Sequence, residues 1–471
     1  MKNEASEHIT IIGAGLVGSL LAAGLAQKGI RVTVLESRPD IRKQKQSAGK
    51  SINLALANRG INALRYVNLF DQVKPLLTPM QGRMVHPLKA SDSDPNNNSL
   101  DDISFAQPQF QPYGIRPTDV IYSVSRAQLN ALLLDEAERF PHVDFHFEHR
   151  VTEADLAANQ LTLQSGQQWS IDRVIGTDGA NSVLRDAIER AANTANTAIE
   201  SVQIDELDHA YKELNIPADD DGKHQLPANA LHIWPRDDFM LIALPNLDGS
   251  FTLTLFLAQK GKYSFEALQD SSAIEHFFQS QFPDVYSKIE HLLESFQSNP
   301  TGKLATVRTP NWHLDDKVLL LGDAAHAIVP FHGQGMNCGF EDCLQMLQLI
   351  DQANQTKTHW RSVFEQTAQL RMPNANAIAD MALENYIEMR SSVTKTSFLK
   401  QKAIAAQIQR WFPKRFIPRY AMVMFESIDY WQAQKLGEVH KALLAELEQR
   451  QDNGEELSQI VCEKALTQYG L

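Results

Sequence analysis

Two junctions in the sequence place glycines and a carboxylate where an apolar segment stops. Near the N-terminus, the run Gly13–Gly18 (GAGLVG) follows the apolar, β-branched segment HITII and opens a segment with helical periodicity. Far downstream, the apolar segment ending at Leu321 stops at Gly322-Asp323, and a glycine-rich stretch leads into a helical segment that opens at Met336-Asn337. Free N–H groups at the start of a helix favour negative charge. Both junctions therefore suit a polar, partly anionic ligand.

The N-terminal glycine pattern is typical of a dinucleotide-binding turn. Its spacing is G-x-G-x-x-G, and Glu36 ends the next expected strand about 20 residues on, where a carboxylate can accept hydrogen bonds from both ribose hydroxyls. Gly13 permits the tight turn, Gly15 lets a pyrophosphate approach the backbone, and Gly18 lets helix and strand pack closely. Glu36 argues against a 2′-phosphate, and hence against NADPH at this position. The turn alone leaves FAD and NAD both open.

The second junction favours FAD over NAD. An NAD site has no need for a second ligand-facing strand end so far downstream, whereas the ribityl chain and isoalloxazine ring of FAD extend well beyond its ADP half. Asp323 would accept a hydrogen bond from a ribityl hydroxyl. The helix starting near Gly335 would direct its dipole and N–H groups at the flavin N1/C2 carbonyl and stabilise the anionic reduced ring. A simple helix cap and a glycine loop explain each residue singly but not the whole set.

The order of the expected elements predicts an α/β protein. Residues 8–36 read strand, helix, strand, and residues 125–190 begin with a helix and continue through strands. Residues 228–257 alternate like antiparallel strands, and from about residue 337 the pattern is helical. We predict a Rossmann-like FAD-binding domain with an inserted antiparallel β-sheet substrate domain and a C-terminal helical region. The predicted bounds are 1–78, 114–185 and 305–368 for the discontinuous FAD-binding domain, 79–113 and 186–304 for the sheet domain, and 369–471 for the helical region.

Composition narrows the class of protein. The chain has 471 residues, 43% of them hydrophobic, which is enough for several domains. A net charge of -13 argues against nucleic acid or an anionic membrane surface as a general partner. Three cysteines cannot build a disulfide framework, no signal peptide is apparent, and no apolar run approaches the roughly 18 residues of a membrane span. We expect a soluble, cytoplasmic protein of unspecified oligomeric state, with a polar surface insertion at residues 89–102.

Three motifs occur together in this chain: the N-terminal glycine turn, Gly322-Asp323, and the Asp178-Gly179 pair in VIGTDGANSVLR. Together they resemble the single-component flavoprotein aromatic hydroxylases. Longer segments, among them LHIWPR (231–236) and ENYIEMR (384–390), are similar to the branch of that family that hydroxylates kynurenine. The polar C-terminal helix, where mitochondrial members carry a membrane anchor, suggests the soluble bacterial type.

The resemblance implies a reaction. FAD is the cofactor, and NADPH and O₂ are co-substrates, with NADPH docking transiently without a Rossmann site of its own. The substrate is L-kynurenine, which is converted to 3-hydroxy-L-kynurenine through a C4a-hydroperoxyflavin, a step in tryptophan catabolism toward quinolinate and NAD. No residue is expected to act as a catalytic base, because the ring amino group already activates the adjacent carbon. No metal is expected.

The resemblance also assigns residues to these ligands. Substrate contacts are expected at Arg83, Tyr113, Asn385 and Tyr420, and the planar guanidinium of Arg83 suits a carboxylate. Pro330, Phe331 and His332 should line the pocket where the aromatic ring meets the flavin, with Leu241, Ala243 and Phe256 keeping it apolar. Cofactor contacts are expected at Gly13, Gly15, Val17, Gly18, Glu36, Arg38, Ala55, Arg126, Val151, Asp178, Asp323, Gly335, Met336 and Asn337.

Other classes of protein stay open at this point. A flavin hydroxylase of another aromatic acid would share every cofactor motif, and a non-catalytic binding protein on the same fold would not need the junction at Asp323. A flavin disulfide reductase needs a cysteine pair soon after the glycine turn, and Cys338 and Cys343 are five apart and do not share a helix face. The histidines of PHVDFHFEH (141–149) are typical of a surface strand rather than a metal site.

Overall fold

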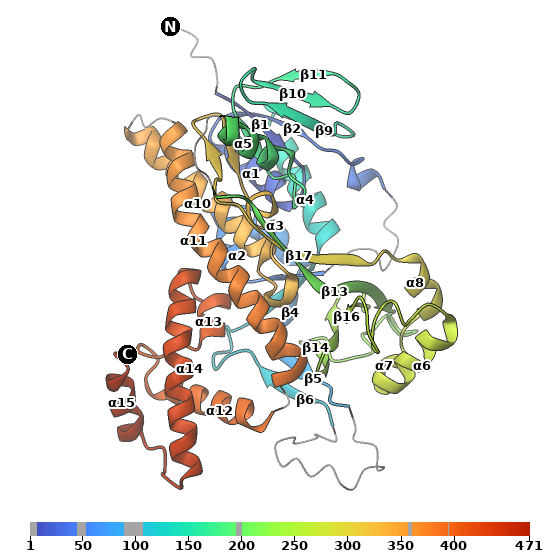
Figure 1. Cartoon of the computed structure of the whole chain (residues 1–471), viewed down its shortest axis with the longest axis vertical. Helices are drawn as coiled ribbons and strands as arrows, with labels where there is room; N and C mark the ends of the chain where they lie inside the picture. The colour runs from blue at the N-terminus through green and yellow to red at the C-terminus, as the bar shows by residue number, and fades with distance from the viewer. Residues whose placement is uncertain (1–6, 45–52, 89–106, 195–199, 357–359, 394) are drawn as a thin grey trace. The chain divides into compact units, whose positions relative to one another are not determined.

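The structure, a computed structural model, describes residues 7–44, 53–88, 107–194, 200–356, 360–393 and 395–471. The chain forms two compact units (Figure 1). The first comprises Met1–Leu77, Val124–Glu206 and Ala305–Ala382, and the second comprises Thr78–Ser123, Leu207–Leu304 and Leu383–Leu471. The C-terminal helices thus fall in the same unit as the large sheet, and the bounds predicted for three separate domains stay a prediction. The predicted surface insertion at 89–102 lies outside the described residues.

A six-stranded, mostly parallel sheet is the centre of the first unit, in the order β18-β19-β12-β1-β2-β8. All neighbours are parallel except β18 and β19. β1 and β2 are buried along nearly their whole length, which is typical of parallel strands covered on both faces. The strands are β1 (His8–Ile12), β2 (Arg31–Leu35), β8 (Val143–His146), β12 (Val174–Gly176), β18 (His313–Leu314) and β19 (Val318–Leu320).

Helices pack closely around this sheet. α1 packs against α4 and α10, and α10 packs against α2. Gly24 makes the approach of α1 to α10 possible, because a Cβ there would lie 2.4 Å from a methyl group of Leu347. The helices are α1 (Leu16–Gln27), η1 (Ile41–Lys43), α2 (Asn58–Tyr66), α3 (Phe70–Val73), η2 (Lys74–Leu76), α4 (Arg126–Glu138), α5 (Val183–Thr194), α9 (Asp323–His326), η3 (Pro330–His332), α10 (Gly335–Thr356) and α11 (Trp360–Ile387), which continues into the second unit. The remaining strands are β3 (Asn53–Leu56) and the antiparallel set β9 (Val151–Asp155), β10 (Gln160–Leu163) and β11 (Gln168–Ser170).

A seven-stranded sheet dominates the second unit, in the order β17-β13-β16-β15-β14-β5-β6. The predicted antiparallel strands at 228–257 are confirmed as β14, β15 and β16, while β5 runs parallel to β14. Its strands are β5 (Gly82–Val85), β6 (Gln109–Pro112), β13 (Gln203–Ile216), β14 (Ala230–Arg236), β15 (Phe239–Pro245), β16 (Phe251–Ala258) and β17 (Gly302–Arg308). β13 and β17 each have one end in the first unit. β4 (Thr78–Met80) and β7 (Ile121–Ser125) pair antiparallel and flank β5 and β6 in the chain; with β3 they form a three-stranded sheet in the order β3-β7-β4.

The two faces of this sheet have different neighbours. One face forms a hydrophobic core with α6 (Ser271–Gln281), α7 (Pro283–Tyr286) and α8 (Leu292–Ser298). Leu241 and Ala243 belong to that core. Arg83 pairs with Leu231, and the register across β14 and β15 places Arg83 on the opposite face. The prediction that Leu241 and Ala243 line the substrate cavity is therefore wrong.

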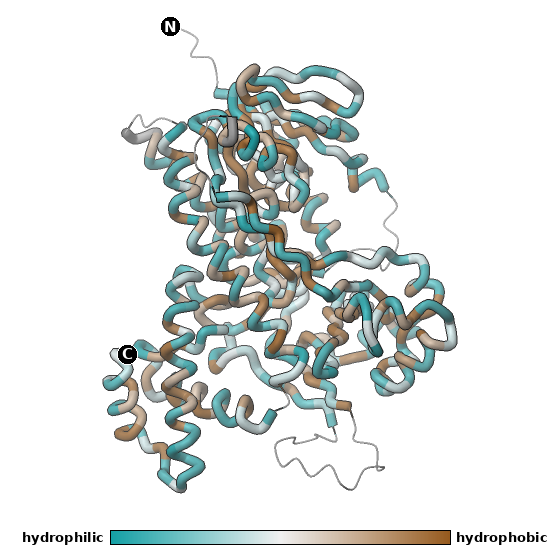
Figure 2. Tube along the Cα trace, in the orientation of Figure 1, coloured by the Kyte–Doolittle hydropathy of each residue, from teal (hydrophilic) through white to brown (hydrophobic). Residues whose placement is uncertain are grey.

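The C-terminal part of the chain is helical, as predicted. It contains the π-helix η4 (Glu388–Ser392), α12 (Thr396–Trp411), α13 (Arg419–Met424), α14 (Tyr430–Asp452) and α15 (Gln459–Gln468). Along α14 the colours of Figure 2 alternate between hydrophobic and hydrophilic. Its buried residues recur at helical spacing, and two of them, Leu443 and Leu447, pack with α12 and α15 in one hydrophobic cluster. None of the described helices is both long and apolar enough to cross a lipid bilayer.

Candidate active site

In the first unit, the ends of four strands bring polar residues to one edge of the sheet. β1, β2, β12 and β19 are parallel, so their carboxyl ends share this edge. The strands are followed by Gly13, Glu36, Thr177-Asp178 and Gly322-Asp323, respectively. Ligands of open α/β sheets bind outside the carboxyl ends of the strands. The predicted cofactor residues at these four positions are thus gathered where a cofactor is expected.

The three glycines of the N-terminal turn have different surroundings. Gly13 has φ 101°, and a Cβ there would lie 2.5 Å from the Thr177 carbonyl oxygen. A Cβ on Gly18 would lie 2.0 Å from the carbonyl oxygen of Gly13. A Cβ on Gly15 would meet nothing within 4 Å. Packing therefore explains Gly13 and Gly18 but not Gly15, which borders open space at the start of α1. That is the place where a pyrophosphate would approach the backbone and the helix N-terminus.

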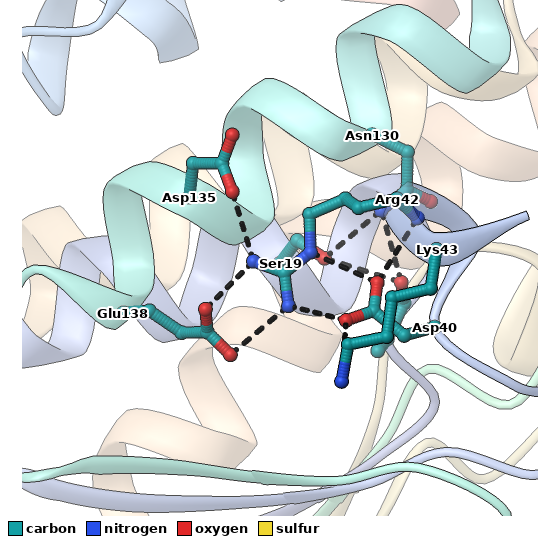
Figure 3. Close-up of polar contacts among 8 residues, drawn as sticks. Ser19, Asp40, Arg42, Lys43, Asn130, Asp135 and Glu138 are labelled. Carbon is teal, nitrogen blue, oxygen red and sulfur yellow. Dashed lines mark hydrogen bonds and ion pairs between the residues drawn. The ribbon is translucent and has the colours of Figure 1, made fainter.

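Side chains from distant segments hold this turn. Thr177 Oγ1 donates to the carbonyl oxygens of Ile12 and Gly13 at 3.0 and 2.9 Å. From α4, Asn130 Nδ2 donates to the Ala14 carbonyl at 3.1 Å and lies 3.3 Å from Ser19 Oγ (Figure 3). Neither Thr177 nor Asn130 is among the residues predicted from the sequence. The only sequence signal for Asn130 is an amide on the apolar side of a helix.

The segment after Glu36 is fastened to α4 by Arg42. Its guanidinium bonds Asp40 of the same segment and reaches Asp135 and Glu138 of α4 at 2.9 and 2.6 Å (Figure 3). The bonds to Asp40 and Glu138 raise the pKa of Arg42 above its ordinary value. Because Asp40 also accepts from the Arg42 backbone N–H, η1 has a defined start. The chain that carries Glu36 and Arg38 is therefore fixed at both ends.

Glu36 is a buried carboxylate that is ionised at neutral pH. It is 4% exposed, and its Oε2 accepts from the Ala14 backbone N–H at 2.7 Å. Arg38 donates to its Oε1 through both the backbone N–H at 2.8 Å and Nε at 2.9 Å. Burial alone would raise the pKa of Glu36, but the hydrogen bonds from Arg38 hold it below the ordinary value. Such a carboxylate beside the glycine turn suits the hydroxyls of a ribose.

The second junction presents a carboxylate to solvent. Gly322 has φ 60°, and a Cβ there would lie 3.0 Å from a methyl group of Val17. Asp323 follows as the first residue of α9 and is exposed. At the neighbouring strand end, Asp178 Oδ2 instead accepts from the Val183 backbone N–H at 2.8 Å and caps the start of α5. Asp323 is therefore the carboxylate at this edge that is presented for a ligand hydroxyl.

A buried cluster of charged groups binds the backbone N–H of Gly322. Asp342 of α10 is fully buried. Its Oδ2 accepts from the Gly322 N–H at 3.0 Å and from His326 Nε2 at 2.6 Å. Its Oδ1 accepts from Arg371 Nε at 2.8 Å. Burial opposes ionisation, but His326 and Arg371 lower the pKa of Asp342 to about 2. Cys338 adds a third group of metal-ligand type within 4.8 Å. Because its Sγ also lies 3.4 Å from Arg371, the cluster is an ion-pair network rather than a cation site.

Around the start of α10, the Asn337 side chain is held by hydrogen bonds within the protein, whereas Gly335 borders open space. Asn337 Nδ2 donates to the carbonyls of Ala55 and Gly333, and its Oδ1 accepts from the Ala57 N–H. These bonds engage the Asn337 amide with β3, so a flavin contact from Asn337 would use its backbone N–H. Gly335 has open space around its α-carbon, and Met336 is half-buried. In η3, Pro330 is exposed, whereas Phe331 and His332 are buried.

Two predicted cofactor residues lie away from the strand ends. Arg126 is exposed at the first turn of α4, whose N-cap is Ser125. Val151 is buried at the start of β9, in the three-stranded sheet.

In the second unit, three of the four predicted substrate residues form one cluster, in which Arg83 and Tyr113 are buried and Tyr420 is half-buried. Arg83 on β5 is 6% exposed, and its guanidinium carbon lies 4.8 Å from the ring centre of Tyr420 on α13. Tyr113, which follows β6, stacks on Tyr420 with ring centres 5.7 Å apart. Burial raises the pKa of both tyrosines, so both are neutral hydrogen-bond donors at physiological pH. Tyr420 lies more than 300 residues along the chain from both Arg83 and Tyr113.

The fourth residue, Asn385, lies just before a π-helical segment that brings an acid to the cluster. Asn385 is 5% exposed near the end of α11, and its Nδ2 lies 3.2 Å from Met389 Sδ. One turn on, Glu388 opens η4 and places Oε1 3.5 Å from an Arg83 terminal nitrogen. Single π-helical turns are frequent at functional sites. Glu388 is not predicted from the sequence, since a charged residue in a helical pattern is usually solvated.

Comparison with known proteins agrees with this site. Residues 7–357 match the FAD binding domain family. The chain is 42% identical over 452 residues to the kynurenine 3-monooxygenase of Myxococcus xanthus, covering 95% of this chain and 92% of the relative. It is 43% identical over 448 residues to the enzyme of that name from Cytophaga hutchinsonii, covering 94% of each. Among solved structures, the tetrameric form of 2-methyl-3-hydroxypyridine-5-carboxylic acid oxygenase is similar in fold, with a TM-score of 0.64, 17% identity, and coverage of 84% of this chain and 96% of that one.

The open space at Gly15, the ionised Glu36 and the exposed Asp323 fit FAD, and the protein is an FAD-dependent aromatic monooxygenase. The predictions of the enzyme class, the fold class and FAD are thereby confirmed. The chain belongs to the kynurenine 3-monooxygenase family.

Proposed function

We propose that this enzyme uses NADPH and O₂ to hydroxylate L-kynurenine to 3-hydroxy-L-kynurenine. One observation carries the proposal: the Arg83 guanidinium is buried among Tyr113, Tyr420 and Glu388, and its Nε has no hydrogen-bond partner in the described part of the chain. A buried cation with an unpaired donor is costly unless a ligand anion completes it. The names of the relatives support kynurenine as the source of that anion.

The charges of the cluster suit an amino acid better than a simple aromatic acid. L-Kynurenine carries a carboxylate, an ammonium and an aminophenyl ketone. Arg83 would bind the carboxylate, Tyr113 and Tyr420 would donate hydrogen bonds beside it, and Glu388 would accept from the ammonium. A benzoate has no ammonium for Glu388 and would bring a second negative charge close to it. The pattern therefore favours kynurenine over the alternative aromatic acids.

Residues of the first unit would hold and shelter the cofactor. Bound FAD would supply the redox chemistry that consumes NADPH and O₂ and transfers one oxygen atom to the substrate. Glu36 would bind the ribose, the N–H groups at the start of α1 the pyrophosphate, and Asp323 a ribityl hydroxyl. The buried side chains of Phe331 and His332 would exclude water, which otherwise promotes loss of activated oxygen as H₂O₂. His332 would act through shape and polarity, because the ring amino group already activates the carbon that is attacked.

The test is NADPH oxidation by the purified, FAD-loaded protein with and without L-kynurenine, with mass spectrometry of the product. Rapid oxidation only with kynurenine, and a product heavier by one oxygen atom, is the expected result. A panel with benzoate, 4-hydroxybenzoate and anthranilate in place of kynurenine tests the alternative substrates. Rapid oxidation that yields only H₂O₂ with kynurenine, or hydroxylation of a benzoate in preference, would refute the proposed substrate.

Arg83→Met tests the carboxylate contact separately. Loss of a buried charge-assisted pair costs about 2–4 kcal/mol, so kynurenine should bind roughly 30- to 700-fold more weakly. The maximal rate of flavin reduction by NADPH at saturating kynurenine should change much less, since the described contacts of the Arg83 side chain are with Tyr420 and Glu388 of its own unit. An unchanged dissociation constant would exclude Arg83 as the carboxylate ligand.

A further inference from the structure

Lys402, on α12, is a cation beside the proposed substrate cluster that the proposed function does not use. Its Nζ lies 3.2 Å from Oε1 of Gln111, a 6% exposed residue of β6. Gln111 is the direct pairing partner of Arg83 in the β5–β6 register. The Gln111 Nε2 donates at 3.4 Å to the carbonyl of Val393, which follows the π-helix that carries Glu388. One glutamine thus joins Lys402 to both charged segments of the cluster.

The cluster contains more positive than negative charge. Arg83 and Lys402 are the cations, and Glu388, 3.5 Å from Arg83, is the acid that acts on both of them. Lys402 has no carboxylate within 4.0 Å in the described part of the chain, and its one hydrogen bond there is to the neutral Gln111. Burial and the nearby Arg83 lower the pKa of Lys402 to about 8. An uncompensated charge pair of like sign in a partly buried site is unfavourable, and an anion between the two would relieve it.

We propose that Lys402 is a second cationic contact for the substrate carboxylate, so that the carboxylate is held between Lys402 and Arg83. This inference rests on the proposed function, because it assigns a further residue to the same carboxylate. Gln111 then acts as a positioning residue that holds the lysine toward β5. Glu388 is left to accept from the ammonium of the ligand.

This arrangement makes affinity depend on pH in a defined way. Lys402 binds a carboxylate only when protonated, and the bound anion raises its pKa. Ligand binding near pH 8 should therefore take up a proton, and the dissociation constant should rise by up to about tenfold per pH unit above pH 8. The charged groups that face Lys402 are Arg83 and Glu388, and the pKa of Arg83 is raised further above its ordinary value, so Arg83 stays charged in this range. Burial raises the pKa of both cluster tyrosines, which removes them from this range as well.

The experiment measures the dissociation constant by flavin absorbance on the full-length, FAD-loaded protein from pH 7.0 to 9.5. The ligands are L-kynurenine and its analogue in which hydrogen replaces the α-amino group, because that analogue has no ammonium to titrate. The variants are Lys402→Met and Lys402→Arg. Lys400→Met is the matched control: Lys400 is on the same helix but pairs with Asp452 at 2.7 Å, on the exposed side.

Lys402→Met should bind the analogue about tenfold more weakly at pH 7, since a hydrogen bond to a charged group is lost, and its pH dependence should disappear. Lys402→Arg should restore affinity at pH 7 and bind equally well at pH 9.5, because arginine stays charged. Lys400→Met should match the parent protein. Equal flavin content in all variants checks folding.

The outcomes separate the two proposals. If the parent protein binds neither ligand, or if Arg83→Met binds both normally, the proposed function fails. If Arg83→Met weakens binding while Lys402→Met keeps the parent affinity and pH profile, only the role of Lys402 is overturned. Should Lys402→Met not fold, Lys402→Arg decides alone, and a dissociation constant that rises above pH 8 as steeply as in the parent protein overturns the inference.

Discussion

The buried ion pairs of Asp342 allow the loss of stability in an Asp342→Asn variant to be predicted in magnitude. Asp342→Asn keeps the shape of the side chain but removes the negative charge that His326 and Arg371 share. Breaking a buried ion pair by removing one partner costs about 3–5 kcal/mol. At about 2.1 cal/mol/K per residue, unfolding of the 471-residue chain as a whole has an entropy of about 1 kcal/mol/K. The melting temperature should therefore fall by about 3–5 °C.

Differential scanning fluorimetry of the FAD-loaded protein measures this shift. Asp351→Asn is the matched control, because Asp351 lies on the same helix but is half-exposed in its pair with Lys28, and a surface pair contributes at most about 1 kcal/mol. The pKa of Asp342 is about 2 in the folded protein and 3.8 ordinarily, so its charge stabilises the fold above pH 4 and this contribution is lost as pH falls through 2. The difference between Asp342→Asn and the parent should accordingly shrink below pH 4. A melting temperature within 1 °C of the parent at pH 7 would refute the reasoning that the charge is needed.

Three further predictions concern single residues. Asp323→Ala should lower flavin retention after gel filtration, because a contact to a ribityl hydroxyl is lost. The melting temperature of the flavin-free protein should stay the same. Full flavin occupancy would contradict the ribityl contact of Asp323. Gly13→Ala should abolish FAD binding and reduce soluble yield, because a Cβ would lie 2.5 Å from the Thr177 carbonyl at a backbone φ of 101°, and normal binding would show that the turn adapts. Burial lowers the pKa of His440 to about 4, so the unfolded chain binds more protons between pH 6.5 and 4 and stability should fall over that range by up to about 3 kcal/mol. His440→Leu should remove that part of the pH dependence in denaturant titrations. An unaltered pH profile would show that His440, whose ring centre lies 4.3 Å from that of Phe416, stays charged when folded.

Local sequence patterns predict the elements of the cofactor site well. The glycine turn, the strand before it and the acid after the next strand lie within 30 residues, so periodicity and spacing are sufficient to place them. The same holds for the strand that stops at Gly322-Asp323 and for the helix that starts at Gly335. The structure differs there only in how Asn337 is used, because its amide is bonded to β3, a contact between segments far apart in the chain.

Long-range contacts account for most of what the sequence could not predict. Thr177, Asn130 and Asp342 each act on a backbone group in a distant segment, and nothing in their local pattern marks them. Arg83, taken alone, resembles a solvated arginine, and its burial depends on strands and helices from three parts of the chain. The error at Leu241 has a simple origin: alternation shows that successive strand residues face opposite ways, but not which face of the sheet meets the ligand.

The strand order of the central sheet has a consequence for how the protein is made. On one side, β1 pairs with β12, which is not synthesised until residue 176, and β12 in turn pairs with β19 at residues 318–320. At about 5–20 residues per second, a growing chain would carry the β1 edge unpaired for roughly 10–30 s. An open, apolar strand edge is a site for pairing with other chains. We expect nascent chains that end before residue 320 to require chaperones, and the flavin to bind only near the end of translation, when Asp323 and the start of α10 have left the ribosome.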